Sequence, residues 1–437
     1  MRTVDRDILR LAVPALGALV AEPLFLLADS AMIGHLGVAP LAGLGLAGAI
    51  LQTIIGLMVF LAYATTPAVA RRLGAGDERG AISVGIDGIW LSVALGMVLA
   101  VAGFAATPLM LSWFGASTNV TQQASVYLSI SMAGIPAMLL VFAGTGVLRG
   151  LQDTRTPLLV AGVGFAANVV LNFVFIYALG LGIAGSAIGT VIAQWGMAGV
   201  YLAVVMRHAR RTGADVRPSR DGISGSALSG GWLFVRTASL RAAILLATFV
   251  ATDLGSTELA GFQVVMTLFT LTAFVLDALA IAAQALVGKG LGAADTAGVR
   301  AILVRCLSWG VGSGVVLGLL VMATAPVTGL LFTGEADLAA LLTPSLVVLG
   351  ISTPLAGFVF VLDGVLIGAG DARYLALSGI LNLACFLPLA IWVATSAPSD
   401  AAGLAFLTAA FSLGYLAARA LTLGLRARTT AWMRTGI

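Results

Sequence analysis

Ala21 to Gly37 read AEPLFLLADSAMIGHLG, an apolar stretch that carries two carboxylates, Glu22 and Asp29. These acids are seven residues apart, so two helical turns place them on the same side of a helix. A charged side chain at the centre of a bilayer costs about 2.5–3.5 kcal/mol on insertion scales, and intramembrane carboxylates commonly line ion or substrate paths. Pro23 lies between the two acids and removes a backbone hydrogen bond, so we expect a hinge there.

The composition of the whole chain is that of a membrane protein. Of its 437 residues, 60% are hydrophobic and only 10% are charged, whereas soluble domains are about 25% charged. Apolar runs of about 20 residues or more recur along the sequence, as transmembrane helices require. We therefore expect an all-α polytopic membrane protein. The pI of about 9.4 does not indicate nucleic-acid binding, because the basic residues follow a membrane pattern.

Charges, prolines and glycines divide the chain into twelve expected transmembrane helices. A polar segment, 207–230, is expected to be a cytoplasmic linker between an N-terminal lobe, 1–206, and a C-terminal lobe, 231–437. The expected spans lie near 8–34, 41–70, 81–110, 122–148, 156–179 and 183–206, then near 229–252, 259–288, 298–325, 338–368, 372–395 and 401–425.

The basic residues predict the orientation of these spans. With the N-terminus inside, 21 of the 23 Lys and Arg residues fall in expected cytoplasmic segments or at the cytoplasmic ends of the spans, and Arg236 and Arg241 fall within the seventh span. All charged residues in the expected outer loops are acidic, for example Asp253, Glu258 and Asp400. This positive-inside bias predicts that both termini are cytoplasmic.

An internal repeat relates the two halves at a constant offset of 218 residues. GVLRGLQDTR (146–155) matches GVLIGAGDAR (364–373), and RRLGAGD (71–77) matches KGLGAAD (289–295). Because each half has an even number of spans, both halves run in the same sense. A pseudo-two-fold axis along the membrane normal is therefore expected to relate two six-helix lobes, with the substrate held between them and transported as they rock.

Asp29 is not duplicated, because Ala247 occupies its place in the second half. A desolvated carboxylate can bind and release a proton, since burial disfavours its charged form, so Asp29 is predicted to be an ion-coupling residue. The alternative is a structural hydrogen bond. Asn168 and Asn172 share one face of the fifth span, and Thr190 follows in the sixth. These three are candidate ion-site residues, although such side chains also serve as hydrogen bonds between helices.

Charged residues in four spans are candidates for substrate binding. Glu22 shares a helix face with Asp29. Asp277 and Asp363 lie in the eighth and tenth spans and are either cation contacts or local partners of the arginines in the seventh. Arg236 is the candidate among those arginines.

No motif indicates an enzyme, a cofactor or a metal site. The chain lacks the G-x-x-x-x-G-K-[ST] phosphate loop, which argues against ATP-driven transport within it. GLGLAG (43–48) sits in a membrane span without a preceding strand, so it is interpreted as helix packing. Two isolated histidines, His35 and His208, and two separated cysteines cannot form a metal centre. The only ion expected is the coupling ion, H⁺ or Na⁺.

Together, these features resemble the multidrug and toxic compound extrusion (MATE) family, in its DinF-like branch. The resemblance implies a two-lobe antiporter of the bacterial inner membrane that exports organic cations or metabolites in exchange for H⁺ or Na⁺. In relatives, the acid matching Asp29 accepts the cation or proton, and positions matching Asn168, Asn172 and Thr190 contribute to the site. The resemblance rests on LADSAMIGHLG (27–37), ARRLGAGD (70–77), GVLRGLQDTRTP (146–157), NVVLNFVFIYALGLGIAGSAIGT (168–190) and DALAIAAQALVGKGLG (277–292).

The sequence departs from some relatives at Asn172, where they carry a second carboxylate. Loss of that charge weakens a Na⁺ cage, so H⁺ is favoured over Na⁺. The expected partners are small amphipathic or cationic substrates and membrane lipid, with the protein acting as a monomer. Two rivals stay open. A flippase for a lipid or lipid-linked precursor would need a cationic cleft, for which only Arg236 and Arg241 are available. A membrane scaffold would not need an unduplicated carboxylate on a bent helix.

Overall fold

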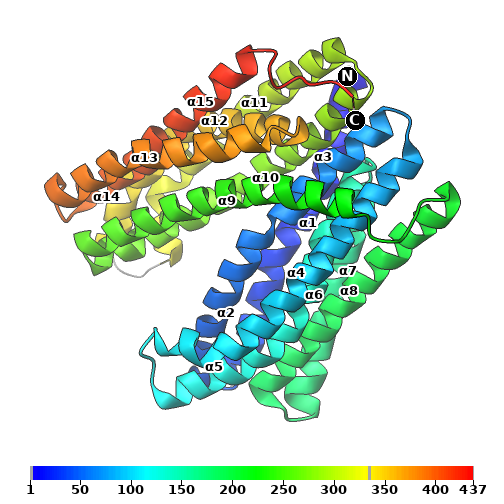
Figure 1. The fold of residues 1–437 in the computed structure, drawn as a ribbon. Helices are drawn as coiled ribbons and strands as arrows, with labels where there is room; N and C mark the ends of the chain where they lie inside the picture. Colours follow the sequence, from blue (N-terminus) through cyan, green and yellow to red (C-terminus); the bar gives the residue numbers. More distant parts are fainter. Residues whose placement is uncertain (1–2, 333–335, 437) are drawn as a thin grey trace. The chain divides into compact units, whose positions relative to one another are not determined.

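A computed structural model describes residues 3–332 and 336–436, with the side chains of 330–341 left aside. Every regular element in these residues is helical (Figure 1). Twelve of the described helical segments are long and apolar enough to cross a membrane. The prediction of an all-α, twelve-span membrane protein is therefore confirmed.

The helices follow one another through short connections. The first half contains α1 (Thr3–Gly34), α2 (Val38–Met58), α3 (Phe60–Gly74), α4 (Glu78–Ser112), α5 (Thr118–Ser131), η1 (Met132–Gly134), α6 (Ile135–Gly150), α7 (Arg155–Phe173), the π-helix η2 (Val174–Ala178) and α8 (Gly182–Thr212). The second half contains α9 (Arg220–Leu254), α10 (Ser256–Gly292), α11 (Thr296–Phe332), α12 (Ala336–Gly368), α13 (Ala372–Ser396), α14 (Ala401–Ala409), the π-helix η3 (Ala410–Tyr415) and α15 (Leu416–Arg428).

Several helices extend further than the sequence predicted. The sixth span continues to Thr212 and the seventh begins at Arg220, so helix occupies much of the expected linker, 207–230. The expected ends were placed where charged residues appear. A helix does not have to stop at the edge of the apolar region, and arginine is a good helix former.

Contacts between Cα atoms divide the chain into two compact units. The N-terminal unit comprises residues 17–230, and the C-terminal unit combines 231–436 with the residues up to Leu16. Two helices therefore change unit along their length. α1 begins in the C-terminal unit and continues in the N-terminal unit, whereas α9 does the reverse.

Glycines pack helices closely at repeat-equivalent places in the two units. A Cβ atom added to Gly146 of α6 would lie 2.8 Å from the backbone oxygen of Ala62 in α3. One added to Gly364 of α12 would lie 2.7 Å from the Cα of Ala280 in α10. Both members of each pair are related by the offset of 218 residues, so the repeat preserves the contact itself. Small residues let transmembrane helices approach in this way.

α1 stays helical from Thr3 to Gly34, including the turn around Pro23. Pro23 therefore does not unwind the helix in this conformation, and its role as a hinge stays a prediction. The residues that follow Pro23 bring Phe25 and Asp29 to the lining of a cavity.

Candidate functional site

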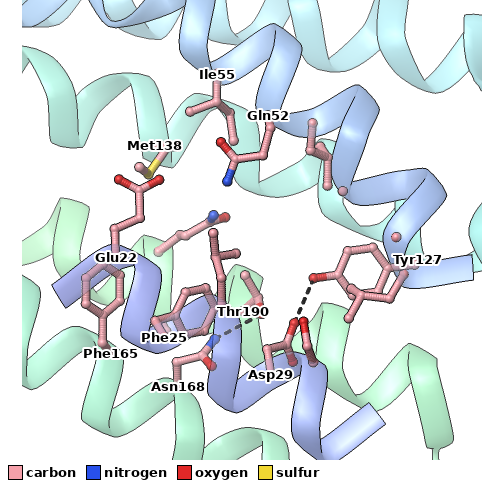
Figure 2. Close-up of a pocket in the computed structure, with 18 of the residues that line it drawn as sticks. Glu22, Phe25, Asp29, Gln52, Ile55, Tyr127, Met138, Phe165, Asn168 and Thr190 are labelled. Atoms are coloured by element: carbon pink, nitrogen blue, oxygen red, sulfur yellow. Dashed lines mark hydrogen bonds between the residues drawn. The ribbon is translucent and has the colours of Figure 1, made fainter. Parts of the chain in front are cut away.

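A cavity of about 330 Å³ lies inside the N-terminal unit, bounded by α1, α2, α5, α6, α7 and α8 (Figure 2). Most of its wall is apolar, and the rings of Phe25 and Phe165 stack there with centroids 5.2 Å apart. Two carboxylates line it, and none of its described lining residues is Lys or Arg. The polar lining residues are Glu22, Asp29, Ser30, Gln52, Tyr127, Asn168, Thr190 and Gln194.

Asp29 is 3% exposed and accepts hydrogen bonds from three neutral donors. Ser186 Oγ donates to its Oδ1 at 2.6 Å, and Asn172 Nδ2 donates to the same oxygen at 2.9 Å. The Tyr127 hydroxyl donates to Oδ2 at 3.4 Å (Figure 2). No Lys or Arg in the described part of the chain forms an ion pair with Asp29. Burying an unpaired charge costs free energy, so binding a proton or a cation at Asp29 would lower that cost.

Asn168 and Thr190 lie beside this carboxylate and bond to each other. Asn168 Nδ2 donates to Thr190 Oγ1 at 2.9 Å, and both residues line the cavity (Figure 2). The amide oxygens of Asn168 and Asn172 are buried and accept no hydrogen bond from the described residues. Most buried polar atoms have a partner, so these oxygens are available acceptors next to Asp29. The structure thus brings the four predicted ion-coupling residues together.

Glu22 lies on the same helix as Asp29 and faces the same cavity, as their seven-residue spacing predicted (Figure 2). Gln52 of α2 lines the cavity as well. The cavity is therefore lined by two carboxylates from one helix and by a pair of stacked aromatic rings. Carboxylates and aromatic rings are both groups that attract positive charge.

The other predicted substrate residues lie in the C-terminal unit and do not line this cavity. Arg236 Nε of α9 donates to Asp363 Oδ1 of α12 at 3.0 Å, and the two side chains form an ion pair. Arg419 Nη2 of α15 lies 3.5 Å from the same oxygen. For Asp363, local pairing with an arginine is what the structure shows. Substrate contact by these residues stays a prediction.

Sequence reasoning did not identify two of the three donors to Asp29. Ser186 lies four residues before Thr190 and so shares its helix face, a signal that could have found it. Tyr127 lies 98 residues from Asp29, and no local pattern marks it. Just after Asn172, the fifth span changes to the π-helix η2, a feature frequent at functional sites.

A buried carboxylate at a cavity between apolar helices long enough to cross a membrane is an arrangement that suits a membrane transporter. The family model described as MatE matches residues 14–174 and 241–395. The chain belongs to the MatE family of transporters, as the sequence resemblance predicted.

Several named proteins are similar to this chain in sequence. A probable multidrug resistance protein NorM of Thermotoga maritima is 26% identical over 47% of this chain and 45% of the relative. The DNA damage-inducible protein F of Escherichia coli is 28% identical over 52% of this chain and 48% of the relative. The chloroplastic protein DETOXIFICATION 44 of Arabidopsis thaliana is 28% identical over 86% of this chain and 74% of the relative. The chain thus matches about half the length of the two bacterial relatives.

Solved structures share the fold over nearly the whole chain. A MOP superfamily transporter from Pyrococcus furiosus, described as having a binding pocket of reverse polarity, superposes with a TM-score of 0.89 at 23% identity. It covers 99% of this chain and 97% of that one. An outward-facing multidrug resistance MATE transporter gives a TM-score of 0.88 at 24% identity, with coverage of 99% and 97%. At these identities, the likeness shows the fold.

Proposed function

We propose that this chain exports small amphipathic or cationic molecules in exchange for protons, with Asp29 as the coupling carboxylate. The observation that carries the proposal is the setting of Asp29, which is buried at a cavity wall and bonded only to neutral donors. Such a carboxylate can change its protonation state without breaking an ion pair. Efflux from proteoliposomes under an imposed pH gradient tests the proposal.

In the proposed cycle, the inward-facing protein takes up substrate with Asp29 deprotonated. The lobes then rock, Asp29 takes a proton from outside, and substrate leaves. Release of that proton to the cytoplasm resets the protein. Proton entry along the membrane potential supplies about 2.3 kcal/mol per charge per 100 mV. Asn172 suits both protonation states, because its amide can donate to the carboxylate and, after a flip, accept from the acid.

A proton is favoured over Na⁺ because of how the site uses its polar groups. Ser186, Asn172 and Tyr127 all donate hydrogens to Asp29, whereas a sodium ion is bound by oxygen lone pairs. The hydrogen-bonded group of Asp29, Ser186, Asn172 and Tyr127 contains a single carboxylate, since the position matched by a second acid in some relatives is Asn172. A proton needs only one carboxylate.

This preference predicts the behaviour of an Asn172→Asp variant. A second carboxylate beside Asp29 creates a stronger cation site, so Na⁺ is expected to stabilise the variant against thermal unfolding and to leave wild type unchanged. A ligand at 100 times its Kd stabilises by about 2.7 kcal/mol. The measurement is the unfolding midpoint in NaCl against KCl at equal ionic strength. Equal stabilisation of wild type by Na⁺ would contradict the preference for protons.

Glu22 is proposed to hold the positive group of the substrate. Charge-assisted hydrogen bonds contribute about 1.5–3 kcal/mol, so Glu22→Gln is expected to raise the KM for a cationic substrate about tenfold or more. A neutral analogue of the same shape should keep its KM. Asp253→Asn, which removes an exposed acid of the other unit, serves as the control. An unchanged KM for the cation in Glu22→Gln would remove Glu22 from the substrate site.

A flippase for lipid-linked precursors fits this cavity less well. A phosphate-bearing substrate is recognised by Arg and Lys side chains, whereas the described lining residues supply carboxylates. Arg236, one of the two candidate cationic residues, is paired with Asp363. The acidic cavity therefore favours export of cations.

The proposal also includes the membrane in which the protein works and its orientation there. The chain is proposed to work as a monomer in the bacterial inner membrane, with both termini in the cytoplasm. The distribution of basic residues supports this orientation. Cysteine labelling of the segment between α8 and α9, at Gly213 for example, should succeed only from the cytoplasmic side. Labelling from the outside would reverse the proposed topology.

A further inference from the structure

The first helix of each half begins in the compact unit formed mainly by the other half. The residues of α1 up to Leu16 belong to the C-terminal unit, and the residues of α9 up to Gly230 belong to the N-terminal unit. α1 and α9 begin at equivalent positions in the 218-residue repeat, within one residue. The exchange is therefore reciprocal, and each unit holds the beginning of a helix whose remainder lies in the other.

In the C-terminal unit, α11 holds the start of α1 through a charged contact. Arg305 Nη2 donates to both carboxylate oxygens of Asp5, at 2.7 and 2.8 Å, and its Nε donates at 2.9 Å. Trp309, one turn along α11, donates its indole N–H to Asp5 Oδ1 at 3.1 Å. Asp5 is only 4% exposed. Bidentate guanidinium–carboxylate pairs fix geometry as well as charge.

In the N-terminal unit, α4 holds the residues that lead into α9. Asp87 Oδ1 accepts a hydrogen bond from the backbone N–H of Ser219, at 2.8 Å, immediately before the helix begins. Trp90, one turn along α4, donates its indole N–H to the carbonyl oxygen of Val216 at 3.1 Å. A carboxylate at the start of a helix is favourable because it faces unpaired N–H groups and the positive end of the helix dipole.

These two contacts are equivalent although their chemistry differs. Asp87 and Arg305 are separated by the repeat offset of 218 residues, and each is followed after one turn by a tryptophan that donates to the same segment. One anchor uses a carboxylate with a backbone N–H, and the other uses a guanidinium with a carboxylate. Asp87 and Arg305 thus differ in charge, but each binds the start of the first helix of one half. What the two positions share is this attachment.

We propose that Asp5, Arg305 and Trp309 anchor the coupling helix to the C-terminal unit, so that a proton at Asp29 acts on both units through α1. This inference rests on the proposed function. Asp29 follows Asp5 by 24 residues, about 36 Å along a continuous helix. Hydrogen bonds hold its far end to α7 and α8 of the N-terminal unit. α1 is thus fixed at one end to each unit, and Arg305 is a positioning residue that acts through it.

Loss of the anchor should separate proton movement from substrate movement. With Arg305→Gln, the start of α1 is free to shift, so the C-terminal unit no longer follows the state of Asp29. We expect the ratio of protons to substrate transported to fall by roughly threefold or more, the scale of coupling changes caused by residues that touch neither ligand. The Kd of substrate for the purified variant should equal that of wild type, because the cavity is intact.

The experiment measures the proton-to-substrate ratio in proteoliposomes for wild type, Arg305→Gln and the charge-swapped Asp5→Arg/Arg305→Asp. The swapped pair should regain part of the lost ratio. Arg72→Gln is the matched control, because Arg72 makes a partly exposed pair with Asp77 at 3.2 Å within one unit and should keep the wild-type ratio. A wild-type ratio in Arg305→Gln would overturn the anchor. Absence of proton-driven efflux in wild type would instead overturn the proposed function.

A cross-link gives an independent test, because it replaces the ion pair with a covalent connection between the same two positions. Cys306 and Cys385 are first replaced by alanine, and Asp5→Cys and Arg305→Cys are then joined by a short bis-methanethiosulfonate linker. An anchor that stays closed through the cycle predicts that the linked protein keeps both its efflux rate and its coupling ratio. Loss of efflux on linking, restored by reduction, would show that this contact opens during transport and would overturn the proposal.

Discussion

Asp29→Asn is expected to reduce proton-driven substrate efflux to the level of liposomes without protein. The amide cannot bind and release a proton in the working pH range, but it has nearly the same volume as the acid. Its NH₂ group also faces the donors Ser186 and Asn172 at close range, so part of the site must rearrange. We expect a loss of about tenfold or more in initial rate, equivalent to at least about 1.4 kcal/mol.

The matched control for this variant is Asp7→Asn, an exposed acid on the same helix. It removes the same charge from α1 without touching the cavity and should retain wild-type efflux. Substrate binding to purified Asp29→Asn, followed by tryptophan fluorescence, separates loss of coupling from loss of folding. Full proton-coupled efflux in Asp29→Asn would rule out this residue as the coupling site.

Gly364→Val is expected to destabilise the protein strongly, whereas the same substitution at an open glycine position is not. The added side chain would meet the backbone of Ala280, with a Cβ only 2.7 Å from its Cα, and backbone cannot rotate away as a flexible side chain can. Overpacking typically costs about 1–3 kcal/mol, occasionally more. The unfolding midpoint of the detergent-solubilised protein should fall, and its yield as a monodisperse species should fall with it.

Gly312→Val is the control for this substitution. A Cβ at Gly312, in α11, has no neighbour within 4 Å, so the same change should leave the midpoint nearly unchanged. Gly146→Val, at the equivalent position of the other unit, should behave like Gly364→Val. Equal midpoints for Gly364→Val and Gly312→Val would show that the close helix contact does not limit stability.

Features with a short period in sequence were predictable. The length of the apolar runs predicted twelve spans, and the seven-residue spacing of Glu22 and Asp29 predicted that both face one cavity. The four-residue spacing of Asn168 and Asn172 likewise predicted that they share a helix face, whereas their place beside Asp29 was expected only from the family resemblance. These predictions succeed because helix geometry alone relates such positions.

Features that depend on contacts between distant residues were not predictable in the same way. Tyr127 and Ser186 reach Asp29 from 98 and 157 residues away, and no local pattern in a single sequence records such pairs. The start of α1 was assigned to the N-terminal lobe because chain order suggests it. The partner of Asp5 lies 300 residues away, so only the folded chain reveals that this segment clusters with the C-terminal unit.

The most direct test of the account is substrate efflux by the purified protein in liposomes, under an imposed pH gradient and separately under a Na⁺ gradient. A fluorescent organic cation serves as the substrate, and proton movement is followed in the same vesicles. The account predicts efflux driven by the pH gradient, with matching proton entry, and none above background under the Na⁺ gradient alone. Efflux driven by Na⁺, or no efflux under either gradient, would contradict it.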